Sequence, residues 1–137
     1  MKKYSYIFLI ILVLVAVILV DYSNKSKQNN DSKKIKMQNS ENVISVRVKE
    51  ETEGGYVYYK TEEKELIEKI INALNNIKIE EKTDISFSDN GKTYILELSD
   101  GTTQEYYFQG SYYCKDKINY KISNYKELNK IEIPKEN

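Results

Sequence analysis

Residues 92–108 read KTYILELSDGTTQEYYF, and this stretch decides the fold that the sequence predicts. Apolar and polar residues alternate on both sides of 99–101, which is the period of a half-buried β-strand. A three-residue loop at 99–101 sets Tyr94 opposite Tyr106 and gives Gly101 the left-handed conformation. A two-residue loop would place polar residues opposite the apolar ones, so we expect a hairpin with the longer turn.

Toward the N-terminus, Asn90-Gly91 is the preferred residue pair for a two-residue hairpin turn. It predicts a preceding strand in which Phe87 lies opposite Tyr94 and Ile85 lies opposite Leu96. All four side chains would then share one face of the sheet.

Strand patterns continue after residue 110. SYYC (111–114) and INYKIS (118–123) alternate about a turn at 115–117, and Tyr120 is expected to face the core with Tyr94 and Tyr106. The residues around 125–128 indicate one short helical turn before a charged tail.

The N-terminal half of this region adds a hairpin and the main helix. VISVRVK (43–49), with Ile44 facing inward, and YVYYK (56–60) flank a Gly-Gly turn and predict two paired strands. Apolar residues then recur at helical spacing over 66–77. The predicted fold class is α+β, an antiparallel β-meander sheet of about six strands with one packed α-helix.

Composition excludes several classes of chemistry. The chain has no histidine, which removes the usual neutral-pH base and the commonest zinc ligand. No Walker loop, GxGxxG or GxSxG motif occurs. We therefore expect no catalytic residue, no metal site and no cofactor, and the protein is predicted not to be an enzyme.

Charged and thiol side chains leave alternatives open. Acidic clusters at 50–53, 62–68 and 80–84 are expected to be solvated, and a carboxylate pair of the glycosidase type is the alternative. Cys114 fits either a half-buried structural residue or an intermolecular disulfide.

Residues 41–137 carry 14 basic and 19 acidic side chains, and this net charge of −5 predicts no nucleic-acid partner.

Residues 7–20, IFLIILVLVAVILV, form an unbroken apolar run after Lys2 and Lys3. The charge-free stretch 4–20 is about 25 Å long as a helix, which fits both a short membrane span and a signal peptide. No small-residue cleavage pattern follows it, and this favours an uncleaved anchor over a cleaved signal peptide. The positive-inside rule then places the N-terminus in the cytoplasm and the remaining chain outside the cell.

The segment after the apolar run is polar. Residues 21–40 contain only two large aliphatic side chains, too few to offset chain entropy. They predict a flexible, disordered linker between an N-terminal transmembrane helix at 1–20 and an extracytoplasmic α+β domain at 41–137. A solvated spacer is the expected role, and contact with anionic lipid or wall polymer is the alternative.

Tyrosines are the candidate binding residues. Clustered surface aromatic side chains offer rigid area with a polar tip, which suits a sugar- or peptide-binding face. We expect Tyr59, Tyr107 and Tyr113 to point outward and to form one exposed patch. The alternative is that tyrosine is abundant because it suits strands and because the composition is biased.

The layout resembles a known type of domain. A basic start and an apolar segment precede a polar tether, VISVRV (43–48), TEEKELI (61–67), the turns SDNG and SDGT, and tyrosine-rich strands. This order resembles small extracytoplasmic domains of unknown function in low-GC Gram-positive bacteria, over residues 41–131. Such domains are often lipoproteins or membrane-anchored. Because no cysteine follows the apolar segment, the resemblance implies a membrane-spanning anchor.

Together these features predict a membrane-anchored extracytoplasmic interaction module. Its predicted partners are the lipid bilayer, through residues 4–20, and an unknown protein or cell-wall partner; its predicted location is the cell membrane, as a single-pass protein with an extracellular C-terminal domain. The alternatives are a carboxylate-dependent enzyme acting on cell-envelope polymer and a passive subunit of a membrane complex.

Overall fold

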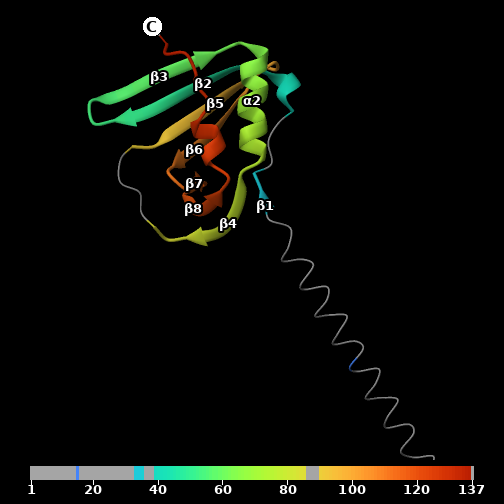
Figure 1. Cartoon of the computed structure of the whole chain (residues 1–137), viewed down its shortest axis with the longest axis vertical. Helices are drawn as coiled ribbons and strands as arrows, with labels where there is room; N and C mark the ends of the chain where they lie inside the picture. The colour runs from blue at the N-terminus through green and yellow to red at the C-terminus, as the bar shows by residue number, and fades with distance from the viewer. Residues whose placement is uncertain (1–14, 16–32, 36–38, 86–89, 137) are drawn as a thin grey trace, which may run out of the picture. The chain divides into compact units, whose positions relative to one another are not determined.

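A computed structural model describes residues 15, 33–35, 39–85 and 90–136. Contacts divide the chain into Met1–Ser32, of which only Val15 is described, and Lys33–Asn137. The second unit is an α+β domain in which one main helix packs on an antiparallel sheet (Figure 1). The predicted class, an antiparallel sheet with one packed helix, is therefore confirmed.

The sheet has eight strands where about six were predicted, and the first of them is only two residues long. In chain order the strands are β1 (Lys33–Lys34), β2 (Val43–Thr52), β3 (Gly55–Thr61), β4 (Lys78–Thr83), β5 (Lys92–Leu98), β6 (Thr103–Gln109), β7 (Tyr112–Lys115) and β8 (Ile118–Ser123). Across the sheet the order is β1-β4-β8-β7-β6-β5-β2-β3, and all neighbours are antiparallel. The other elements described are the 3₁₀ turn η1 (Ser40–Asn42) and the helices α2 (Lys64–Asn75) and α3 (Lys126–Asn129).

The central meander follows from its turns. Tyr94 pairs with Tyr106 across the predicted three-residue loop, and Gly101 has a φ of +82°. At the β7–β8 turn, Asp116 and Lys117 have φ values of +52° and +63°, the left-handed conformations that match the twist of two paired strands. The predicted meander is therefore confirmed from β5 to β8.

The hairpin predicted at Asn90-Gly91 is wrong. Leu96 pairs with Val46 of β2 on one side and with Gln104 of β6 on the other, so Ile85 cannot pair with it. Ile85 is 46% exposed, and residue 87 lies outside the described residues. The strand β2 pairs with β5 along most of its length and buries apolar side chains there, whereas β4 lies beyond β8, across the sheet from β5.

A bulge in β2 turns Ile44 outward. The register of β2 on β5 shifts between Val43 and Ser45, and both of these side chains are buried. Ile44 between them is 54% exposed. The predicted inward position of Ile44 is wrong, because an extra residue in one strand interrupts the alternation of faces.

The sheet begins inside the stretch predicted to be a linker. Lys33 pairs with Ile79 and Lys34 with Lys78, and Ile35 is 5% exposed within the core. The linker prediction is therefore wrong for 33–35. The pairing of β1 with β4 and the burial of Ile35 depend on residues far along the chain, so the composition of 21–40 does not indicate them.

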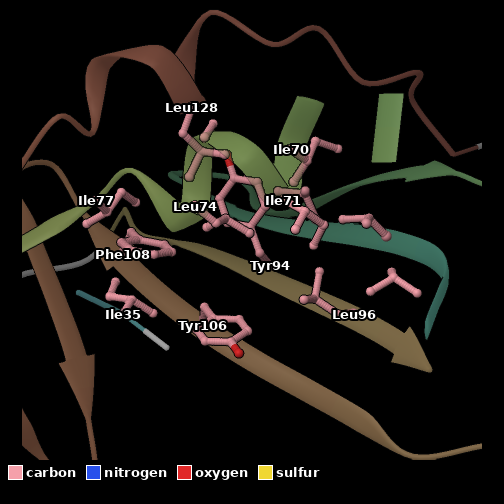
Figure 2. Packing of buried hydrophobic residues seen from close by; sticks show 14 of the residues in the cluster. Ile35, Ile70, Ile71, Leu74, Ile77, Tyr94, Leu96, Tyr106, Phe108 and Leu128 are labelled. Atoms are coloured by element: carbon pink, nitrogen blue, oxygen red, sulfur yellow. The ribbon is translucent and has the colours of Figure 1, made fainter. Parts of the chain in front are cut away.

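Helix α2 supplies one side of the core. Ile70, Ile71 and Leu74 recur at helical spacing and are at most 2% exposed. Figure 2 shows them facing Tyr94 and Leu96 of β5. The predicted inward positions of Tyr94 and Tyr106 are confirmed, since both are buried.

Buried tyrosines make the domain sensitive to alkali. Burial raises the pKa of Tyr113 and of Tyr125, each to about 12, and it also raises the pKa of Tyr94. Because a neutral tyrosine is favoured in the fold, this stabilisation is complete below the unfolded-state pKa near 10 and is lost as the pH rises toward 12. We expect the free energy of unfolding in urea to fall steadily above pH 10, and the fall to be smaller in a Tyr113→Phe variant. Equal pH dependence in the variant and the parent would contradict this assignment.

Candidate functional site

The helices α2 and α3 cover one face of the sheet, and their buried residues are part of the core. Neither of these helices covers the other face. Because side chains alternate along a strand, the residues between the buried ones point to this second face, which we call the open face. One row of it crosses seven strands in register. From β3 to β4 the row consists of Tyr58, Lys49, Thr93, Tyr107, Cys114, Asn119 and Thr83.

Four tyrosines lie on the open face. Tyr107 and Tyr112 come from the middle of the sheet, and Tyr56 and Tyr58 come from β3 at its edge. Tyr56 is 55% exposed and Tyr58 is 40% exposed. The Nζ atom of Lys49 lies 3.8 Å from the centroid of the Tyr56 ring, which is a cation–π contact. The β2–β3 end of the face therefore combines exposed aromatic rings with a cation.

The predicted patch of Tyr59, Tyr107 and Tyr113 is not formed. Tyr59 pairs with Val48 and packs against the core, and Tyr113 is 4% exposed. Only Tyr107 of the three lies on the open face. The prediction is wrong because these strands place Tyr59 and Tyr113 on the opposite side of the sheet from Tyr107.

Sequence reasoning missed Tyr58 and Tyr112, which are the immediate neighbours of the two misplaced residues. Two-residue turns pair Thr52 with Gly55 and Gln109 with Tyr112. Counting residues back from such pairs determines which side of the sheet each side chain occupies. Two-residue turns at 53–54 and 110–111 would therefore have predicted from the sequence that Tyr58 and Tyr112 lie on the open face.

A carboxylate on the open face is held by three donors. Glu51 Oε2 accepts hydrogen bonds from the backbone N–H groups of Asn90 (3.4 Å) and Gly91 (3.2 Å) and from the Tyr107 hydroxyl (3.4 Å). The Tyr107 ring lies over Gly91, where a Cβ atom would overlap it. These contacts position the Tyr107 ring and occupy one oxygen of the Glu51 carboxylate.

Two lysines on this side of the sheet form ion pairs. Lys60 Nζ lies 2.7 Å from Glu62 Oε1, and this hydrogen bond raises the pKa of Lys60. Lys121 Nζ lies 3.7 Å from Glu81 Oε1. Within the described residues, no group of three or more acidic or cysteine side chains is arranged to hold a metal ion. The open face is therefore an aromatic surface of mixed charge.

The fold and this face define a small α+β domain with one helix-covered and one open, tyrosine-bearing sheet surface. A family model described as Signal recognition particle 9 kDa protein (SRP9) matches residues 15–80, a little under half of the chain. No curated protein and no solved structure shows significant similarity to the chain.

The SRP9 match contradicts the resemblance to small extracytoplasmic domains of low-GC Gram-positive bacteria. The matched segment crosses both predicted boundaries, at 20 and at 40, and continues through β2, β3 and α2. It therefore spans segments of all three predicted parts, the anchor, the linker and the domain. The match also contradicts the predicted function, a membrane-anchored extracytoplasmic interaction module. The two alternatives, an enzyme acting on cell-envelope polymer and a passive subunit of a membrane complex, are corrected for the same reason.

The same match contradicts the predicted partners and location. These were the lipid bilayer through residues 4–20, a protein or cell-wall partner without nucleic acid, and a single-pass position in the cell membrane. No helix in the described part of the chain is long and apolar enough to cross a membrane. Apart from Val15, the predicted span lies outside the described residues.

Proposed function

We propose that this chain is a non-catalytic component of an assembly of the signal recognition particle type and that it binds RNA through the open face. The observation that carries the proposal is the match of residues 15–80 to a family named for that particle. The matched segment includes Lys49, Tyr56 and Tyr58, which are the exposed end of the open face.

The chemistry of this end suits unpaired bases. Sheet domains that bind single-stranded RNA stack bases on exposed aromatic side chains, and each stacked base contributes roughly 1–3 kcal/mol. Tyr56 and Tyr58 project from the same side of β3, two residues apart. Lys49 pairs with Tyr58 and its ammonium group contacts the Tyr56 ring, so this end of the face offers a cation for a phosphate beside the two rings.

Charge supports a local mode of binding. Residues 41–137 have a net charge of −5, so the domain as a whole does not attract a phosphate backbone. Stacking and one or two cations must then supply the affinity. With one or two phosphate contacts, the logarithm of the binding constant is expected to fall with the logarithm of salt concentration at a slope of about −0.7 to −1.4.

Two features support a non-catalytic role. The chain contains no histidine, and Glu51 on the open face already accepts hydrogen bonds from Gly91 and Tyr107. A general base needs an oxygen or nitrogen that can reach a substrate proton. We therefore assign the face to binding.

Fluorescence anisotropy with the full-length chain tests the proposal. The probes are labelled signal recognition particle RNA and a shuffled RNA of the same length, and we expect tighter binding of the first. A Tyr56→Ser/Tyr58→Ser variant is expected to bind roughly 10- to 100-fold more weakly, because the stacking surfaces are lost. The matched Tyr56→Phe/Tyr58→Phe variant keeps the ring faces and is expected to bind like the parent.

Three results would overturn the RNA proposal: no binding of either RNA at low salt, equal binding of the two RNAs, or parental affinity in the serine variant. Circular dichroism of each variant shows whether the fold is retained. Because Tyr56 and Tyr58 are exposed, their replacement is expected to leave the free energy of unfolding within about 0.5 kcal/mol of the parent.

A further inference from the structure

The C-terminal segment pairs with the outer edge of β3. The Lys60 N–H donates to the Pro134 carbonyl (3.0 Å), and the Glu136 N–H donates to the Tyr58 carbonyl (2.8 Å). Tyr59 and Lys135 form an antiparallel bridge between these two bonds. Residues 134–136, which we call the tail, therefore extend the sheet as a short added strand, and Figure 1 shows the C-terminal end of the chain beside β3.

One ion pair holds the end of the tail. Arg47 Nη2 donates to Glu136 Oε1 at 3.3 Å, and Arg47 Nε lies 3.3 Å from Glu136 Oε2. The two side chains are 36% and 34% exposed, and ion pairs at such positions contribute little to stability. Pro134, Lys135 and Glu136 are all exposed residues. The tail itself is therefore held by two backbone hydrogen bonds and one partly exposed ion pair, and it follows Ile133, which packs against the core.

The edge of β3 continues beyond the tail. Since the backbone groups of Lys60 and Tyr58 face the outer edge, alternation directs those of Tyr56 to the same edge. Within the described residues, the tail hydrogen-bonds β3 at Lys60 and Tyr58. An edge strand of this kind is a template for an incoming strand.

We propose that the outer edge of β3, from Tyr56 to Lys60, is a docking site for an extended peptide of a partner protein. The peptide runs antiparallel to β3 and carries a carboxylate opposite Arg47, and the tail occupies the site as its intramolecular counterpart. The tail itself carries the argument, because it shows the direction of pairing and the position of the acidic residue. A peptide longer than the tail gains further backbone hydrogen bonds at Tyr56.

Reciprocal charge reversal in the full-length chain tests this site. The probes are two labelled peptides: KIEIPKEN, the sequence of residues 130–137, and the same peptide with arginine at the position of Glu136. A Glu136→Arg chain repels its own tail from Arg47, and we expect it to bind the first probe ~3- to 10-fold more tightly than the parent chain does. An Arg47→Glu chain is expected to prefer the arginine-bearing probe instead.

The decisive result is that the Glu136→Arg chain prefers the probe with the native glutamate and the Arg47→Glu chain prefers the probe with arginine. Equal binding of the two probes by both variants, or no gain over the parent chain, would overturn the peptide site. A stable dimer of the Glu136→Arg chain in sedimentation would also overturn it, since the edge would then take the tail of a second copy. RNA binding by the Glu136→Arg chain, which leaves Lys49, Tyr56 and Tyr58 unchanged, reports separately on the open face, so failure of one proposal is distinguishable from failure of the other.

Discussion

Replacing Phe108 with alanine is expected to lower the free energy of unfolding by ~3–5 kcal/mol. Phe108 is fully buried, and its ring centroid lies 5.8 Å from that of Tyr94, 5.3 Å from that of Tyr113 and 5.4 Å from that of Tyr125. The substitution removes a large buried ring and leaves a cavity among side chains from other elements of the core. Urea unfolding followed by circular dichroism measures the loss.

The control for Phe108 is an exposed aromatic residue in the same sheet. Tyr58→Ala removes a ring of similar size from a side chain that is 40% exposed, and we expect its effect to be within about 0.5 kcal/mol. If both variants lost the same stability, Phe108 would not be the centre of the aromatic core. Because a domain of this size has a total stability of roughly 5–15 kcal/mol, the Phe108 variant is expected to lose a large share of the parent's free energy of unfolding.

Replacing Gly91 with alanine is expected to lower the free energy of unfolding by ~1–3 kcal/mol, which is the usual effect of overpacking. The added methyl group would overlap the ring of Tyr107, which also donates its hydroxyl to Glu51. Either the ring or the backbone at Gly91 must move, and the hydrogen bond from the Gly91 N–H to Glu51 is then weakened. Urea unfolding again measures the change.

A second glycine and a double variant isolate this effect. Gly54 has no heavy atom within 4 Å of a Cβ position and lacks a positive φ, so Gly54→Ala is expected to be nearly neutral. In a Gly91→Ala/Tyr107→Ala chain the overlap is relieved, and we expect the second substitution to cost less than it does in the parent. Strict additivity of the two changes, or equal effects at Gly54 and Gly91, would show that Tyr107 does not close over Gly91.

Taken by itself, the sequence determined the elements that have local signals. The apolar spacing over 66–77 predicted α2, because one helical face must be buried. The three-residue loop at 99–101 and the Gly-Gly turn before residue 56 predicted two hairpins, since turn chemistry and alternation set the register within a few residues. The positions of Tyr94 and Tyr106 in the core followed from that register.

Only the tertiary structure decided which distant strands lie together. The pairing of β5 with β2, the position of β4 beside β8 and the tail on β3 join segments that are far apart in the chain. No local residue pattern specifies such pairings, because they depend on which apolar edges are complementary once the sheet assembles. These pairings also determined which side chains lie on the open face. Because Tyr59 pairs with Val48, Tyr59 faces the core and Tyr58 lies on the open face. A displacement of one residue along a strand would reverse the face of every side chain in it.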